Sequence, residues 1–213
     1  MKGKQLFLAE VKKLNLSFFD FYLDEDSPYI LGTIYLPDEK GCFIDSYKIK
    51  IEIKNDYPNS LPLVFETSKR IPNNIEWHVF PDGHCCIVTP PEESIICRKG
   101  ITLEKFLTTH VVPYFHNQLF REINGYFLHE RSHGTEGVQE YFKSLFRSND
   151  VKKISEWLKF VAKRKEPSRI ANCFCGSNKK YRKCHRNIFR ELQNLTIKEL
   201  IGYSVIIKDD NLV

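Results

Sequence analysis

Four side chains near the C-terminus have the types and the spacing of a closed zinc site. Cys173 and Cys175 are separated by one residue, and Cys184 is followed directly by His185. Structural zinc takes four nitrogen and sulfur ligands in a tetrahedron. A segment this short cannot fold by apolar burial alone, so the metal would supply its folding free energy. The sequence therefore predicts one structural Zn2+ held by these four side chains.

The segment that carries these ligands resembles a known motif. It reads Cys-Phe-Cys-Gly-Ser-Asn-Lys-Lys-Tyr-Arg-Lys-Cys-His. This is similar to the SEC-C motif, the zinc tail of the secretion ATPase and of many bacterial proteins. The resemblance implies the same four ligands. No open ligand position is apparent, so a catalytic zinc is not expected.

Three other cysteines, Cys85, Cys86 and Cys97, are candidate nucleophiles. They lie between residues 71 and 100, a stretch rich in Pro and Gly that we expect to be irregular. Long irregular segments inside a compact domain are usually functional. The chain has seven cysteines at uneven spacing, which does not fit a disulfide framework. Clustered thiols of a reducing compartment are more often metal ligands or reactive groups.

The elements that must position these groups follow from hydrophobic periodicity. Alternation of apolar and charged residues from Tyr47 to Lys54 indicates a strand with one wet face. Thr102 is a candidate N-cap for a helix that Pro113 should kink or interrupt. The other predicted elements are helices at 4–14, 138–146 and 151–162, strands at 29–36 and 63–67, and a short helix with a further strand within 188–207. This order predicts an α+β fold with helices segregated from an antiparallel sheet.

An ordered series of motifs occurs in the first 145 or so residues. Tyr57 to Val64 read Tyr-Pro-Asn-Ser-Leu-Pro-Leu-Val, His78 follows, and Asp82 to Ile87 read Asp-Gly-His-Cys-Cys-Ile. This series resembles the ubiquitin-conjugating fold, in its divergent bacterial branch, which has Tyr-Pro-x-x-x-Pro-x-Val after the third strand, then His-Pro-Asn and Gly-x-x-Cys-Leu. The resemblance implies an N-terminal helix, a four-stranded antiparallel meander and C-terminal helices, followed here by a small zinc knuckle.

The resemblance also implies a thioester chemistry with Cys86 as the nucleophile. His78 and His84 are the candidate supporting groups. Cys97 and Cys85 are the alternative nucleophiles. Cys97 precedes Arg98 and Lys99, and nearby positive charge lowers a thiol pKa. Cys85 would point to the opposite side from Cys86 in extended backbone, as a core thiol does.

One departure from the family concerns the group that stabilises the oxyanion. His78 is followed by Val79 and Phe80 instead of Pro and Asn. A backbone amide, His84 or an asparagine such as Asn73 or Asn74 would have to replace the missing Asn. Such departures point to the bacterial relatives found in antiphage operons.

A loop around Arg131 and His133 is a further candidate part of the active site. Two histidines, a glutamate and an arginine occur between residues 129 and 134. Arg131 or His133 could contact an incoming peptide tail. The alternative is a hydrogen-bonded connection between two helices.

We expect three parts in the chain: a conjugating-type domain at 1–146, a helix and linker at 147–168, and a zinc-binding tail at 169–213. The first residues are charged and lack the apolar core of a signal peptide. No apolar run is long enough to cross a bilayer. We therefore expect a cytoplasmic protein without membrane contact.

The expected partners follow from the chemistry. An acyl carrier needs a separate adenylating enzyme, because no nucleotide-binding glycine loop occurs in this chain. Its cargo would be a protein with a C-terminal carboxylate, either a nucleotidyltransferase that makes cyclic nucleotides or a ubiquitin-like protein. Two alternatives stay open: a non-catalytic binding module of the same fold, and a nucleic-acid adaptor that uses the basic residues between Pro167 and Arg190.

Overall fold

The computed structural model describes residues 2–23, 27 and 29–208, and for Lys2 the backbone only. Its contacts divide the chain into two compact units. The first unit comprises Met1–Val88 and Gly100–Glu130, and the second comprises Thr89–Lys99 and Arg131–Val213. Compact units need not be independently folding domains, so the division at residues 146 and 168 stays a prediction.

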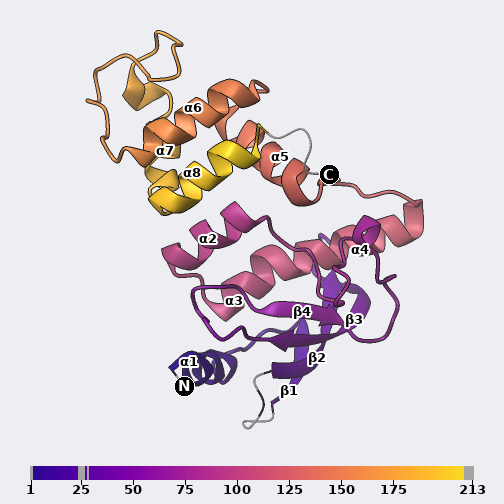
Figure 1. Ribbon diagram of the computed structural model, residues 1–213. Coiled ribbons are helices and arrows are strands. Elements are labelled where there is room, and N and C mark those ends of the chain that lie inside the picture. Colours follow the sequence, from indigo (N-terminus) through magenta and orange to yellow (C-terminus); the bar gives the residue numbers. More distant parts are fainter. Residues whose placement is uncertain (1, 24–26, 28, 209–213) are drawn as a thin grey trace. The chain divides into compact units, whose positions relative to one another are not determined.

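A four-stranded antiparallel sheet forms the centre of the first unit (Figure 1). The strands are β1 (Phe19–Leu23), β2 (Tyr29–Pro37), β3 (Phe43–Glu52) and β4 (Leu63–Glu66), and they lie in sequence order. The predicted meander is thus confirmed. Tyr47, Ile49 and Ile51 of β3 are buried while Lys48 is exposed, as the period-two pattern requires.

Helices cover the buried face of this sheet. The chain begins with α1 (Lys2–Val11) and later forms the short 3-10 helix η1 (Ile75–Trp77), α3 (Leu103–Phe106), one π-helical turn η2 (Leu107–Val111) and α4 (Val112–Asn124). Phe115 of α4 stacks on Tyr47 of β3 with ring centroids 4.8 Å apart. Thr102 caps α3, as predicted, by accepting from the Lys105 N–H.

The disturbance predicted at Pro113 takes the form of the π-helical turn η2, which directly precedes α4. Proline lacks an N–H and crowds the preceding turn, and a wider turn relieves this crowding. Pro113 then lies in the first turn of α4, directly after the π-helical turn in which the Val112 N–H donates to the Leu107 carbonyl.

The second unit is helical (Figure 1). It comprises α2 (Pro90–Lys99), α5 (Gly134–Phe146), α6 (Val151–Ala162), the 3-10 helix η3 (Tyr181–Lys183), α7 (Arg186–Leu192) and α8 (Ile197–Ile206). One apolar core joins these elements, and its buried side chains include Phe142, Phe146, Trp157, Leu158, Tyr181, Phe189 and Leu200. The predicted zinc segment therefore contributes to the same core as α5 and α6.

Two sequence predictions in this unit were wrong. Residues 90–99 form a helix instead of an irregular segment, because Pro90 and Pro91 occupy its first turn, where proline is tolerated. The strand expected within 188–207 is helix α8. Thr196 and Glu199 form a capping box that starts this helix. None of the helices in the described ranges is long and apolar enough to cross a membrane.

Candidate functional site

The segment after η1 in the first unit folds back as a short hairpin that carries two adjacent cysteines. Val79 pairs with Cys85 in an antiparallel bridge. Gly83 makes the turn with a φ of +92°, in the region that favours glycine. The Cys85 N–H donates to the Val64 carbonyl of β4 at 2.7 Å. The hairpin is thereby tied to the edge of the sheet.

Cys85 and Cys86 differ in accessibility. Cys85 is 5% exposed, and burial raises the pKa of its thiol to about 12. Such a thiol is almost fully protonated at neutral pH and is a poor nucleophile. Cys86 is half-buried. The more accessible thiol of the pair is thus the one predicted from the sequence.

His78 lies beside Cys86. A ring nitrogen of His78 is within 4.8 Å of the Cys86 Sγ, and the Cys86 N–H donates to the His78 carbonyl at 2.7 Å. The His78 side chain is buried, and its Nε2 is 3.6 Å from the Glu130 Oε1. An imidazole beside a thiol can accept its proton and stabilise the thiolate.

Two polar side chains of α4 hold the backbone on which His78 lies. The Tyr114 hydroxyl donates to the His78 carbonyl at 3.0 Å, and the Gln118 Nε2 donates to the Trp77 carbonyl at 2.7 Å. They are one helical turn apart and so share a face. Burial raises the pKa of Tyr114 well above its usual value, so the hydroxyl keeps its proton. The His78 carbonyl therefore accepts from both Tyr114 and the Cys86 N–H.

The other predicted supporting groups are engaged within their own loop. The His84 Nδ1 is 2.6 Å from the Asp82 Oδ1, and its ring stacks on Phe80 at 4.3 Å between centroids. Asn74, one of the asparagines expected near the oxyanion, caps η1 by accepting from the Glu76 N–H at 2.8 Å. These contacts give His84 and Asn74 roles in shaping the loop.

The remaining candidates of the active site belong to the second unit. Cys97 lies on α2 and is buried, with 8% of its surface exposed. The Arg131 Nη1 is 3.4 Å from the Glu92 Oε2, and His133 is the N-cap residue of α5. Any action of Cys97, Arg131 or His133 together with Cys86 stays a prediction.

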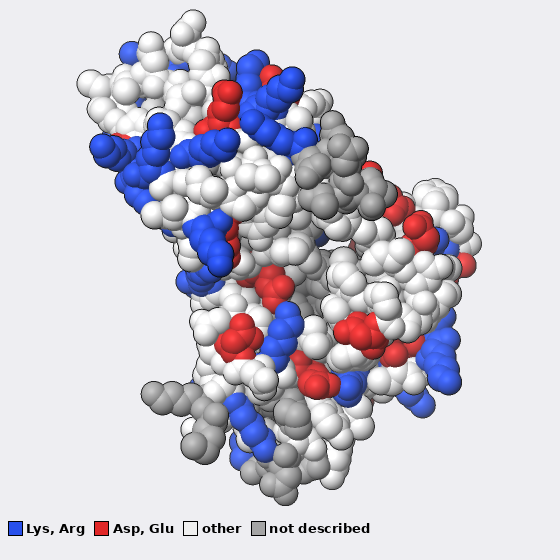
Figure 2. All heavy atoms as spheres, in the orientation of Figure 1, with Lys and Arg blue, Asp and Glu red and all other residues white. Residues whose placement is uncertain are grey.

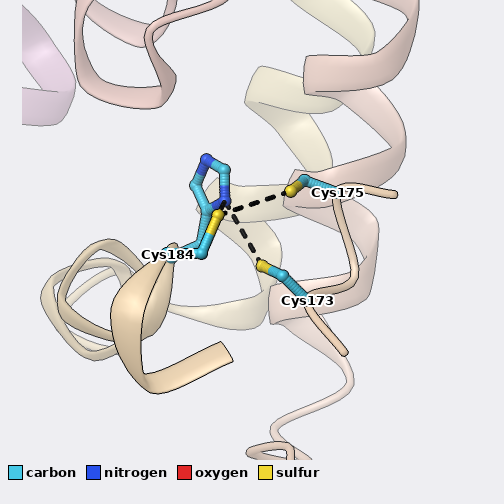
Figure 3. A group of neighbouring side chains, drawn as sticks. Cys173, Cys175 and Cys184 are labelled. Atoms are coloured by element: carbon cyan, nitrogen blue, oxygen red, sulfur yellow. Dashed lines mark hydrogen bonds between the residues drawn. The ribbon is translucent and has the colours of Figure 1, made fainter. Parts of the chain in front are cut away.

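The four predicted zinc ligands converge in the second unit. Their ligand atoms, Sγ of three cysteines and a ring nitrogen of His185, all lie within 4.8 Å of one another. Figure 3 shows Cys173 and Cys175 pointing toward Cys184 across the loop. The Cys175 and Cys184 sulfurs are 3.6 Å apart, and the His185 Nδ1 is 3.4 Å from the Cys173 sulfur. Zn–S bonds of about 2.3 Å give tetrahedral edges of about 3.8 Å between sulfurs, so this spacing suits zinc.

A small hairpin places these ligands. Asn172 pairs with Lys180 in an antiparallel bridge, and the Cys173 N–H donates to the Lys179 carbonyl at 2.9 Å. Gly176 has a φ of +77° and lets the chain turn directly after the first two cysteines. The 3-10 helix η3 then leads into Cys184. The ligand pairs are therefore brought together by backbone hydrogen bonds as well as by any metal.

The contacts of the His185 ring are those expected of a histidine that binds a metal. Its Nδ1 faces the cysteines, while its Nε2 is 3.4 Å from the Phe146 carbonyl. A ligating histidine usually donates its second ring N–H to such an acceptor, which fixes the tautomer. Burial among aromatic rings, including Trp157 with a centroid 5.5 Å away, lowers the pKa of His185. This favours the neutral ring that binds metals.

Comparison with known families agrees with this geometry. Residues 171–187 match the SEC-C motif. No curated protein and no solved structure matches the chain. The residues of the motif and the Cys3His cluster are thus compatible with a metal site, while the likeness of the first unit to ubiquitin-conjugating proteins stays a prediction.

Proposed function

We propose that the first unit is a cysteine-dependent acyl carrier of the ubiquitin-conjugating type, with Cys86 as its nucleophile. The observation that carries this proposal is the pairing of the half-buried Cys86 with a ring nitrogen of His78 within 4.8 Å. The four-stranded meander that precedes the pair has the order expected for this fold. The buried Cys85 is a poorer candidate because its pKa is raised.

The first step is acylation of Cys86. A separate enzyme supplies a protein whose C-terminal carboxylate is activated as an acyl adenylate. The Cys86 thiol gives its proton to His78, and the thiolate attacks the carbonyl carbon. A C–S bond forms, the C–O bond to AMP breaks, and AMP leaves with the electron pair of that bond.

The second step transfers the acyl group to an amine. The nitrogen of a lysine side chain attacks the thioester carbonyl, a C–N bond forms, and the Cys86 thiolate leaves. One proton of the amine passes to a base, for which His78 is a candidate because it lies beside Cys86. Cargo proteins of two kinds fit this cycle, a nucleotidyltransferase and a ubiquitin-like protein, and a role in antiphage defence is part of the proposal.

We also propose that Cys173, Cys175, Cys184 and His185 hold one structural Zn2+. With all four positions taken by protein atoms, the ion would crosslink η3 and the preceding hairpin without taking part in acyl transfer. The proposal is supported by the ligand distances and by the acceptor behind His185, the Phe146 carbonyl.

Capture of the acylated protein tests the proposed carrier function. A tagged full-length chain is purified without reductant from the cells that encode it, and its intact mass is measured before and after hydroxylamine. We expect an adduct that hydroxylamine removes and that Cys86→Ala abolishes. Cys42→Ala removes another accessible thiol, at an exposed position, and should keep the adduct. An adduct that survives Cys86→Ala would contradict the assignment.

A further inference from the structure

Five exposed cations gather on the segment that forms the zinc-type site. They are Arg169, Lys179, Lys180, Arg182 and Lys183, which we call the basic knuckle surface. Figure 2 shows Lys and Arg side chains gathered over α6 and along the margin of this segment, whose face in that view is otherwise mostly white. None of the five cations is among the four residues of the metal-type cluster.

Backbone pairing forces these like charges together. The Arg182 N–H donates to the Arg169 carbonyl at 3.2 Å, and Lys180 lies in the bridge with Asn172. Like charges held close destabilise a folded segment unless counter-charges offset them. An anionic partner would offset the repulsion among these five cations, so the cluster favours binding of such a partner.

Carboxylates of the same unit do not neutralise the basic knuckle surface. Glu166 is the acid closest to it in sequence, and its carboxylate pairs with Arg190 at 2.9 Å and Arg186 at 3.5 Å. Within the described ranges, none of the five cations of the surface forms an ion pair with a carboxylate. Their charge is available to a ligand.

Charge is divided unevenly between the two units. The second unit contains 20 Lys and Arg against 11 Asp and Glu, whereas the first contains 12 against 16. The net charge of +5 for the whole chain therefore conceals a strongly basic second unit and an acidic first unit. Such asymmetry is typical of chains with one part that binds a polyanion.

We propose that the basic knuckle surface binds the phosphate backbone of double-stranded nucleic acid. Phosphate contacts by Lys and Arg need little apolar area. An acidic protein partner would instead need an apolar interface core, and Ile170 is the only exposed large apolar side chain between residues 169 and 190, all of which are described.

Single strands fit this surface less well than duplexes. Proteins that prefer single strands stack bases on accessible aromatic rings. Tyr181 is fully buried, and Phe174 stacks on Phe160 with centroids 4.7 Å apart. These rings are committed to the helical core, so the surface offers charge without stacking. Binding should accordingly be insensitive to base sequence.

Salt dependence of duplex binding tests this proposal. The full-length chain is titrated into a fluorescent duplex of about 20 base pairs, followed by anisotropy. Each phosphate contact contributes about −0.9 to the slope of log K against log salt, so five contacts predict about a 500-fold loss of affinity between about 50 and 200 mM salt. The variant Lys179→Ala/Lys180→Ala/Arg182→Ala/Lys183→Ala should lose about threefold to fourfold over the same range, because about one contact remains.

A matched control removes the same charge from the first unit. Lys13→Ala/Lys40→Ala/Lys69→Ala/Lys105→Ala replaces four exposed lysines and should bind as the wild type does. Both variants must melt as the wild type does, which their surface positions predict. Equal slopes for the knuckle variant and the wild type would overturn the proposal. Tighter binding of the single strand would overturn the duplex assignment, and equal binding of polyglutamate would favour an acidic protein.

Discussion

Removing the Tyr114 hydroxyl tests how α4 holds the loop that carries Cys86. In the wild type this buried hydroxyl donates to the His78 carbonyl at 3.0 Å. A buried hydrogen bond contributes about 1 kcal/mol net, and an orphaned buried group costs up to about 3 kcal/mol. The His78 carbonyl still accepts from the Cys86 N–H in Tyr114→Phe. We therefore expect Tyr114→Phe to lower the free energy of unfolding by about 1 kcal/mol.

Hydrogen exchange at the Cys86 amide measures how much the substitution destabilises the loop that carries Cys86. About 1 kcal/mol is about a fivefold change in an opening equilibrium, so the amide should exchange about fivefold faster in Tyr114→Phe. The melting temperature should fall by roughly 4 °C. Tyr126→Phe is the matched control, because its ring is 61% exposed, and it should change neither quantity. Unchanged exchange at Cys86 in Tyr114→Phe would refute the proposed support by α4.

Three further predictions concern the metal, the pH dependence and the thiols. We predict that elemental analysis of the wild type finds one equivalent of zinc, and that Cys184→Ser removes it and lowers the melting temperature. The Arg98 guanidinium and other hydrogen bonds outweigh desolvation and lower the pKa of Glu199 from 4.5 to about 2. The charged form of Glu199 therefore stabilises the fold above the unfolded pKa, and this stabilisation is lost as the pH falls from about 4.5 to about 2. In thermal melts the melting temperature of the wild type should approach that of Glu199→Gln over this pH range. In the native protein iodoacetamide should label Cys86 much faster than Cys85, whose pKa is about 12; equal rates by peptide mapping would contradict this.

Elements with a clear hydrophobic period could be predicted from the sequence. The alternation in β3 and the residues of α6 gave the correct element type, because each pattern lies within one short stretch. Helix α2 could not be predicted in this way, because two consecutive prolines are typical of a loop. Here Pro90 and Pro91 lie in the first turn of the helix, where proline is tolerated. Helix α8 was taken in part for a strand because Val205 and its isoleucine neighbours are β-branched, and the capping box at Thr196 was overlooked.

The two candidate sites also differ in how far they could be predicted from the sequence. The zinc-type ligands are close in sequence, so their spacing was enough to find them. Tyr114 was not found, since it contacts a residue 36 positions earlier. The available signal was the pair Tyr114 and Gln118, two polar residues one turn apart beside the apolar positions of a predicted helix. Glu130 lies in the 129–134 loop, which the sequence marks as a candidate part of the active site, but its proximity to His78 in particular depends on the tertiary fold.

Replacement of the nucleophile by serine tests the central claim most directly. A Cys86→Ser variant that still accepts the activated carboxylate would hold it as an oxyester, which resists thiol reductants better than a thioester does. The full-length variant is isolated from the cells that encode it, treated with excess thiol, digested and mapped by mass spectrometry. We predict a protein C-terminus esterified at residue 86, while the wild-type adduct is released by the same treatment. An adduct mapped to another residue, or a wild-type adduct that thiol does not release, would contradict the assignment of Cys86 as the acyl carrier.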